Sequence, residues 1–145
     1  MAALKTVKAQ AKGLEGFYIE AKVGNHTVFV DQARDGGGMD KAPTPLDYTF
    51  VALASCLITI GKIVAFQQKI NLRGMEVSVE GGLNLDVLRG KEMNERSGFK
   101  SIQIQMSIDA DMTQEEKEKF AHEVERRCPV SDNLLNTTPL EVMVH

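Results

Sequence analysis

An alternation of apolar and polar residues fills two parts of the chain, before residue 32 and between residues 74 and 108. Because successive side chains of a strand point to opposite faces of a sheet, this period of two predicts antiparallel strands. Glycine turns separate the first three strands, and the pair Gly81-Gly82 predicts a bulge or bend inside the fourth. With a final strand at the end of the chain, the predicted strands cover residues 5–11, 17–23, 26–31, 74–87, 102–108 and 140–144.

A second pattern, apolar around most of a helical circumference, runs from residue 44 to about residue 68. Thr44 suits the cap of this helix, Pro45 its first position, and Asp47 its third, where a carboxylate interacts favourably with the helix N-terminus. A helix that is apolar nearly all round is typical of one surrounded by protein. We therefore expect it at the centre of the fold. Because one small sheet cannot cover it, we also expect a tight homodimer.

Two shorter helices follow the second group of strands. Residues 113–116, Thr-Gln-Glu-Glu, form a capping box that predicts a helix to about residue 127, and Pro129 helps to end it. Ser131 is expected to cap a short third helix. This order of elements predicts an α+β fold in which antiparallel sheets wrap around the long buried helix. The chain length suits a single domain, residues 1–145.

Charge and composition narrow the range of partners and compartments. The formal net charge of −3 offers no broad positive field, so neither nucleic acid nor a membrane surface is expected as a partner. Between Asp47 and Lys62 the apolar helix has about 14 uncharged residues, whereas a membrane span needs about 20. The start of the chain lacks the apolar run and cleavage site of a secretory signal, which makes the cytoplasm the expected compartment.

Two cysteines, Cys56 and Cys128, are the main candidates for chemistry. Helical spacing puts Cys56 in phase with Leu53 and Cys128 in phase with Val124, so both thiols should face the core. A buried free cysteine often acts only as a small apolar side chain. Chemistry would require a thiolate stabilised by a cation, a hydrogen bond or a helix N-terminus, and Cys128 has the better position for the last of these. The spacing alone leaves both interpretations open.

Other reactive side chains give weaker signals. The three histidines, His26, His122 and His145, lack ligand spacing on one element, so no metal site is expected. The glycine triplet at residues 36–38 precedes a helix, but the Lys-Ser or Lys-Thr of a phosphate-binding loop does not follow it. No cofactor is therefore predicted, and residues 34–43 are interpreted as a flexible connection.

Residues 42–56 read Ala-Pro-Thr-Pro-Leu-Asp-Tyr-Thr-Phe-Val-Ala-Leu-Ala-Ser-Cys. They resemble the central-helix motif of the osmotically inducible protein C and organic hydroperoxide resistance (OsmC/Ohr) family, Pro-x-(Glu/Asp)-x-x-x-x-Ala-Leu-x-x-Cys. Residues 128–135, Cys-Pro-Val-Ser-Asp-Asn-Leu-Leu, are similar to the family's second signature. The resemblance, closest to the OsmC-like branch, implies an OsmC-like fold. It also implies an intertwined homodimer with sheets over two central helices and active sites at the subunit interface.

The resemblance also implies roles for individual residues. In characterised members the helix cysteine attacks an organic hydroperoxide and becomes a sulfenic acid, which the second cysteine resolves as a disulfide. By this analogy Cys56 is peroxidatic, Cys128 is resolving, and a cellular dithiol reduces the pair. Those members also use an arginine from the early strands and a glutamate at the start of the central helix. Asp47 is the acid nearest to that glutamate position, and Arg34, in the glycine-rich loop, is the first arginine of the chain.

Two hypotheses about function follow. The leading one is a thiol-dependent redox protein that reduces organic hydroperoxides. The alternative is a non-enzymatic protein of the same fold that binds a small apolar ligand or serves as a thiol sensor, with its cysteines merely buried. The absence of an arginine before Arg34 favours the alternative, whereas the cysteine pair favours the enzyme.

Overall fold

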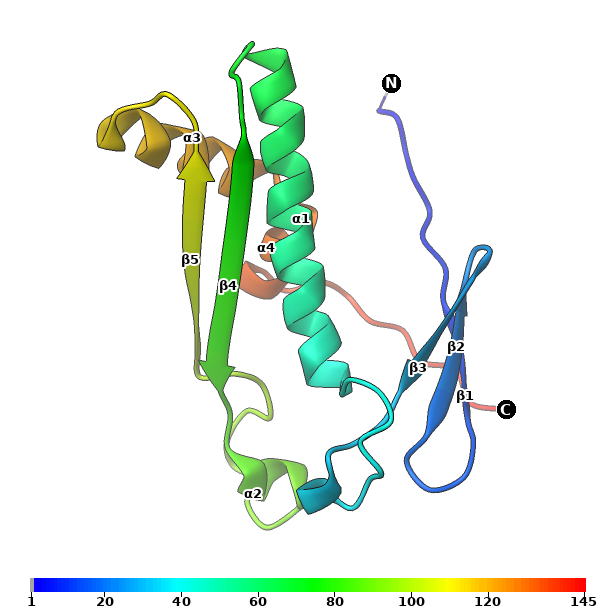
Figure 1. Ribbon diagram of the computed structural model, residues 1–145. Helices are drawn as coiled ribbons and strands as arrows, with labels where there is room; N and C mark the ends of the chain where they lie inside the picture. Colours follow the sequence, from blue (N-terminus) through cyan, green and yellow to red (C-terminus); the bar gives the residue numbers. More distant parts are fainter. Residues whose placement is uncertain (1) are drawn as a thin grey trace. The chain divides into compact units, whose positions relative to one another are not determined.

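In the computed structural model, which describes residues 2–145, the chain is an α+β protein with two antiparallel sheets and one long helix (Figure 1). It forms two compact units, Met1–Thr49 and Phe50–His145. The predicted fold class is thus confirmed, whereas the single domain stays a prediction.

The first unit is built on a sheet with the strand order β1-β2-β3. Its strands are β1 (Gln10–Gly13), β2 (Ile19–Val23) and β3 (His26–Val30). β2 and β3 are joined at Gly24, whose φ of 59° lies in the left-handed region that favours glycine. The three predicted strands are present, but the first begins at residue 10 and not at residue 5. Leu4 and Val7 remain exposed, because the ladder with β2 starts only at Gln10.

The glycine-rich loop after β3 closes on itself. It contains a short 3-10 helix, η1 (Arg34–Gly36), and the Asp40 N–H donates to the Gln32 carbonyl at 3.0 Å across its two ends. The buried carboxylate of Asp31 accepts three further backbone N–H groups of this segment. A buried acceptor thus organises the backbone of the loop that the sequence predicts to be a flexible connection, and its flexibility stays a prediction.

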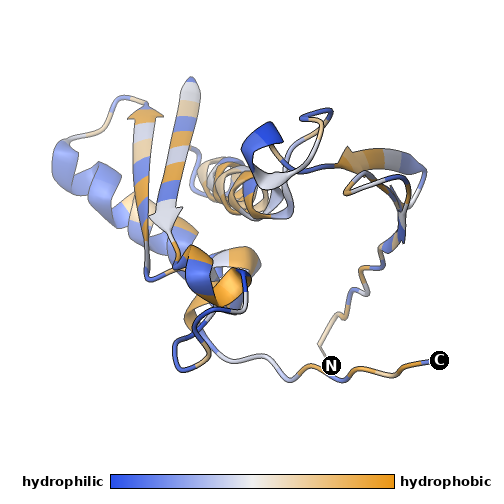
Figure 2. Cartoon of the chain, turned by 90° about the horizontal axis from the view of Figure 1, so that it is seen from below, coloured by the Kyte–Doolittle hydropathy of each residue, from blue (hydrophilic) through white to orange (hydrophobic). Residues whose placement is uncertain are grey.

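The long helix α1 spans Pro45–Gln67, close to its predicted bounds. Its buried residues form one stripe at helical spacing: Leu53, Leu57, Gly61, Val64 and Ala65. Other apolar side chains of the helix stay exposed, among them Val51 at 57% and Phe66 at 86%. Figure 2 shows the apolar colouring of this helix. A single chain therefore covers one side of α1, as expected for a helix that one small sheet cannot cover, and its full burial by a second copy stays a prediction.

The buried stripe of α1 packs against a hairpin formed by β4 (Gly74–Gly82) and β5 (Ser101–Asp109). Alternate residues of both strands are partly buried against this core, and Figure 2 shows that apolar and polar residues alternate along the hairpin. Gly61 permits the close approach, because a Cβ there would lie 2.6 Å from the Met75 Sδ. By length and composition alone α1 could also cross a membrane, but its stripe is that of a core helix packed on a sheet.

The end of β4 differs from the sequence prediction. Gly81 and Gly82 stay in register with β5, so the predicted bulge is wrong. The strand then ends, and a short helix, α2 (Leu85–Leu88), replaces the predicted continuation to residue 87. The reason is local, because the Asn84 side chain accepts a hydrogen bond from the Asp86 N–H at 3.0 Å and caps the helix.

The last two helices are α3 (Gln114–Arg127) and α4 (Pro129–Leu135). α3 opens with the predicted capping box, in which Thr113 and Glu116 exchange hydrogen bonds. α4 begins earlier than predicted, and its cap is Cys128 in place of Ser131. Pro129 explains the shift, because proline is preorganised for the first position of a helix.

The final segment, after α4, does not form the predicted strand at residues 140–144. In the part of the chain that the structure describes, these residues have no strand partner. Leu140, Val142 and Val144 are 82% exposed or more. A strand needs an edge with which to pair, and one chain does not supply it here.

Candidate functional site

Cys56 lies in the middle of α1 and is partly buried. Leu53, one helical turn earlier, and the adjacent Leu57 are no more than 1% exposed. The thiol therefore sits at the edge of the buried stripe, where it packs against the core. This position agrees with the helical phase expected from the sequence.

Cys128 is the single residue between α3 and α4. Its extended backbone, with φ −82° and ψ 112°, is the conformation favoured before a proline, and it separates the two helices. The residue is 1% exposed, and its Sγ accepts a hydrogen bond from the Ser131 N–H at 3.4 Å. A thiol thus takes the place that an oxygen of serine, threonine or asparagine takes at most helix N-caps.

The two thiols are neighbours, and both cysteines are free. Burial raises the pKa of the Cys128 thiol above its ordinary value, and the neighbouring Cys56 thiol raises it further. The backbone N–H groups of Ser131 and Val130 lower the same pKa, but they do not reverse the shift. The start of α4 therefore does not make Cys128 an acidic thiol. Cys128 therefore keeps its proton near neutral pH.

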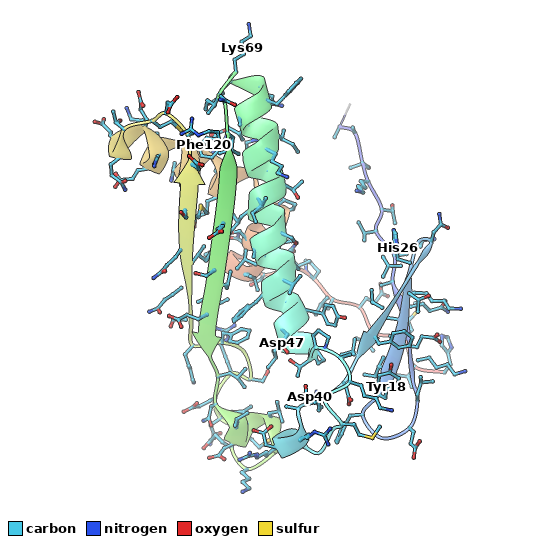
Figure 3. All side chains as sticks on the ribbon, viewed as in Figure 1. Tyr18, His26, Asp40, Asp47, Lys69 and Phe120 are labelled. Atoms are coloured by element: carbon cyan, nitrogen blue, oxygen red, sulfur yellow. The ribbon has the colours of Figure 1, made fainter. Side chains whose placement is uncertain are left out.

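Asp47, labelled in Figure 3, caps the start of α1. Its carboxylate accepts the Thr44 N–H at 2.9 Å, and its own N–H donates to the Thr44 Oγ1 at 3.1 Å. This reciprocal pair is a capping box with aspartate in the third helical position. Both hydrogen bonds of Asp47 are explained by helix capping. A role of Asp47 in the chemistry stays a prediction.

Arg34 is the first residue of η1 and is exposed. It belongs to the unit Met1–Thr49, whereas both cysteines belong to the unit Phe50–His145. The structure thus brings Cys56 and Cys128 together within one unit. The contribution of Arg34 to their chemistry stays a prediction.

The contacts of two residues, one in each unit, were not foreseen from the sequence. Ser131 was expected to cap a helix through its side chain, but its backbone N–H donates to Cys128. Asp31 was placed only at the end of a strand, although it is a buried carboxylate. The spacing Cys-x-x-Ser before a helix and an aspartate before a glycine-rich loop are the signals that could have indicated them.

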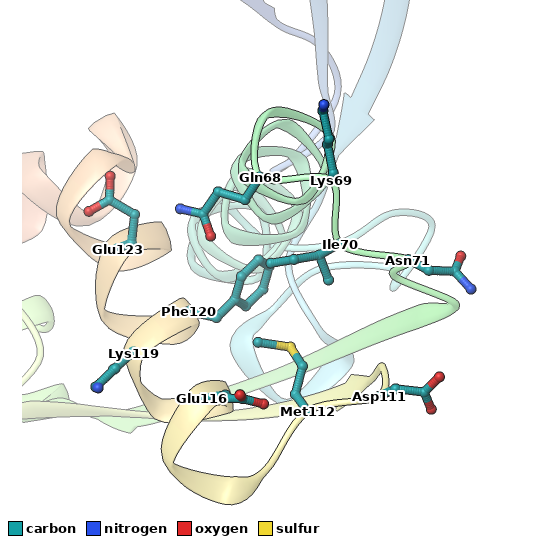
Figure 4. A pocket seen from close by; sticks show the side chains of 10 residues that line it. All are labelled: Gln68, Lys69, Ile70, Asn71, Asp111, Met112, Glu116, Lys119, Phe120 and Glu123. Carbon is teal, nitrogen blue, oxygen red and sulfur yellow. The ribbon is translucent and has the colours of Figure 1, made fainter.

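A hollow of the second unit lies elsewhere. It has a volume of about 510 Å³ and lies at the C-terminal end of α1, beside α3 (Figure 4). Phe120 and Met112 are among its apolar residues, and neither cysteine lines it. Glu116 is engaged with the Thr113 N–H and Glu123 with Arg126, so two of its carboxylates already have partners. The thiol pair is therefore the better candidate for chemistry.

Comparison with known proteins gives one family. Residues 38–143 match the family model described as OsmC-like protein. A search of curated proteins gave no match. The matched range includes both cysteines and all of α1.

Solved structures share the fold at low sequence identity. An OsmC-like protein from Mycoplasma pneumoniae is 19% identical, with a TM-score of 0.80, and the match covers 92% of this chain and 89% of that one. An organic hydroperoxide resistance protein OsmC from Legionella pneumophila is 24% identical, with a TM-score of 0.71 and coverage of 92% and 91%. A third, from Vibrio cholerae, is described as a putative organic hydroperoxide resistance protein with captopril bound in one of its active sites. It is 16% identical, with a TM-score of 0.68 and coverage of 94% and 89%.

Proposed function

The chain belongs to the OsmC-like protein family, and within that family we propose that it reduces organic hydroperoxides through the thiols of Cys56 and Cys128. The observation that carries the proposal is that these two free thiols are neighbours. Solved structures that share the fold are described as organic hydroperoxide resistance proteins, which supports a redox role.

The raised pKa of Cys128 supports a division of labour between the two sulfurs. Cys56, as the thiolate, attacks the terminal oxygen of the hydroperoxide, the O–O bond breaks, and the alkoxide leaves as an alcohol after it takes up a proton. The Cys56 sulfenic acid then reacts with the thiol of Cys128, which forms a disulfide and releases water. An external dithiol reduces the disulfide by exchange and is itself oxidised.

A homodimer and a small-molecule substrate belong to the same proposal. The exposed apolar side chains of α1 and of residues 140–144 support a second copy of the chain as the partner that covers them. The Vibrio cholerae protein with captopril in an active site supports a pocket for a small organic molecule in this family. We propose the cytoplasm as the compartment, because a reducing environment keeps both thiols available.

One observation favours the non-enzymatic alternative. The groups that shift the pKa of Cys128 are burial, Cys56 and two backbone N–H groups, and no cation is among them. A thiolate without a nearby cation is harder to form. The alternative function is binding of a small apolar ligand, or thiol sensing, on the same fold.

A thiol titration decides between the two functions. Free thiols are counted on the reduced protein before and after one equivalent of cumene hydroperoxide, and disulfides are mapped by mass spectrometry of peptides. We expect the loss of both thiols and a Cys56–Cys128 bridge. Two thiols that remain reactive after the peroxide would contradict the proposal and favour the binding protein.

A further inference from the structure

Arg127 is the last residue of α3, and its side chain reaches the last residue of α1. Its Nη1 donates a hydrogen bond to the Gln67 Oε1 at 2.9 Å, although the two residues are 60 positions apart in the sequence. The same Nη1 lies 3.7 Å from the Glu123 Oε1, one turn earlier in α3. In residues 2–145 this is the one side-chain hydrogen bond between α1 and α3. The guanidinium therefore adds a directional contact to two helices that share an apolar core.

The surroundings of this contact favour a fixed geometry. The side chain of Arg127 is 31% exposed and that of Glu123 is 30% exposed, whereas the side chain of the adjacent Arg126 is 65% exposed. A hydrogen bond from a charged donor is stronger than one between neutral groups, and partial removal from water strengthens it further. Arg127 thus fixes the last turn of α3 against α1, whereas Arg126 pairs with Glu123 inside α3.

Cys128 follows Arg127 directly and takes its orientation from the same turn. Its N–H donates to the Glu125 carbonyl at 3.2 Å, and its extended backbone then leads the chain into α4. The thiol is the neighbour of Cys56, which lies about three turns before Gln67 in α1. α1 therefore meets the end of α3 at two points, the contact with Arg127 and the pair of thiols. A rotation of the last turn of α3 would change both contacts together.

We infer that Arg127 is a positioning residue: its contact with α1 holds Cys128 at Cys56 and so favours closure of the disulfide. The inference deepens the proposed function and rests on it, since the disulfide is one step of that function. Arg127 acts through the backbone of the next residue and not as a cation on the thiols, because its guanidinium is engaged by Gln67 and Glu123. A disulfide closes only in a narrow geometry, so a fixed end of α3 raises the effective concentration of the two thiols.

The test is the equilibrium of the chain with mixtures of reduced and oxidised glutathione. Closure transfers two electrons and two protons from the thiols of Cys56 and Cys128 to glutathione disulfide, which becomes two molecules of glutathione. After an acid quench, mass spectrometry measures the fraction of chains with the intramolecular disulfide. The chains compared are wild type, Arg127→Ala, Gln67→Ala and the double variant. This equilibrium reports the approach of the two thiols whether or not the protein reduces peroxides.

We expect Arg127→Ala and Gln67→Ala each to lower the equilibrium constant for closure by about threefold to tenfold, as for the loss of one hydrogen bond at a partly exposed site. The double variant should add less than about twofold to either, because both changes remove the same contact. Arg126→Ala is the matched control, since the hydrogen bonds of that arginine go to Glu123 inside α3, and it should leave the constant within about twofold of wild type. Circular dichroism checks the fold of each variant, and Gln67→Ala carries the test alone if Arg127→Ala does not fold.

An unchanged equilibrium constant in either folded single variant would overturn the inference, as would independent effects in the double variant or an equal loss in Arg126→Ala. A wild-type chain that forms no disulfide in any mixture would also overturn it. The proposed function is judged separately, by the thiols that wild type loses to cumene hydroperoxide. A shifted glutathione equilibrium without peroxide consumption would contradict the peroxidase and leave the positioning role of Arg127 standing. Peroxide consumption with no shift in the variants would do the reverse.

Discussion

The backbone N–H of Ser131 points at the Sγ of Cys128 across 3.4 Å, at the buried junction of α3 and α4. The surroundings of Cys128 therefore shift the pKa of its thiol in opposite directions. The N–H groups of the first turn of α4 favour a thiolate, whereas burial and the neighbouring Cys56 favour the protonated thiol, and the second pair is stronger. A thiol with a raised pKa is a poor first nucleophile and a suitable donor to a neighbouring thiolate.

The raised pKa of Cys128 predicts the order in which the two thiols react, with Cys56 first. Cys56→Ser should abolish peroxide turnover, whereas Cys128→Ser should permit one fast oxidation that stalls or proceeds to sulfinic acid. Mass spectrometry after a single pulse of cumene hydroperoxide checks the order. Sulfenic or sulfinic acid on Cys56 of the Cys128→Ser protein agrees with it, and the same adducts on Cys128 of the Cys56→Ser protein would invert it.

The hydrogen bonds that the loop backbone donates to the Asp31 carboxylate predict a pH dependence of stability. Hydrogen bonds from backbone N–H groups, first that of Lys41, hold the pKa of the carboxyl below its ordinary value, although burial acts in the opposite direction. The folded state thus favours the ionised form, so the contribution is present above the unfolded pKa, near 3.9, and is lost as pH falls through the lower folded pKa. Urea unfolding of wild type and Asp31→Asn should differ most at pH 5 to 7, about one unit or more above that pKa, and converge below it. A difference in the free energy of unfolding that grows toward acid pH would contradict a stabilising role of the ionised Asp31 carboxylate.

Backbone strain at the end of α1 gives a third prediction. Lys69 has a φ of 57° at the helix C-terminus, where the Ile70 N–H donates to the Ala65 carbonyl at 2.8 Å. This is the left-handed position that glycine usually occupies. Lys69→Gly should raise the free energy of unfolding by about 0.5 to 1 kcal/mol, since relief of about 1 kcal/mol or more of strain exceeds the added chain entropy. Lys62→Gly, in the helix interior, is the control and should lower it by about 1 kcal/mol. The same sign for both variants would refute the assignment of strain.

The sequence predicted the elements that depend on periodicity and failed where one side chain redirects the backbone. α1, α3 and the β4–β5 hairpin follow their apolar patterns. Asn84 ends a predicted strand because its side chain caps α2, and no period of two reveals such a local hydrogen bond. Cys128 was recognised as inward-facing, but its role as a cap was missed because cysteine is not among the usual capping residues. Asp31 was missed because its three partners are backbone groups of a loop whose conformation the sequence does not specify.

Exposed apolar surface leads to the last prediction, the oligomeric state. Phe66 on α1 is 86% exposed, and Val144 near the end of the chain is 90% exposed. Large apolar side chains this accessible cost free energy in water, at about 25 cal/mol per Å², and a partner that covers them stabilises the assembly. Light scattering should therefore give a mass twice that of the 16.0 kDa chain. Phe66→Glu should weaken the dimer by about tenfold to a hundredfold, because a buried aromatic anchor is replaced by a charge. Met93→Glu, at a loop residue that is 78% exposed, is the matched control and should leave the mass unchanged. A stable mass near that of one chain at micromolar concentration would reject the dimer, and an unchanged dimer in Phe66→Glu would move the interface away from this end of α1.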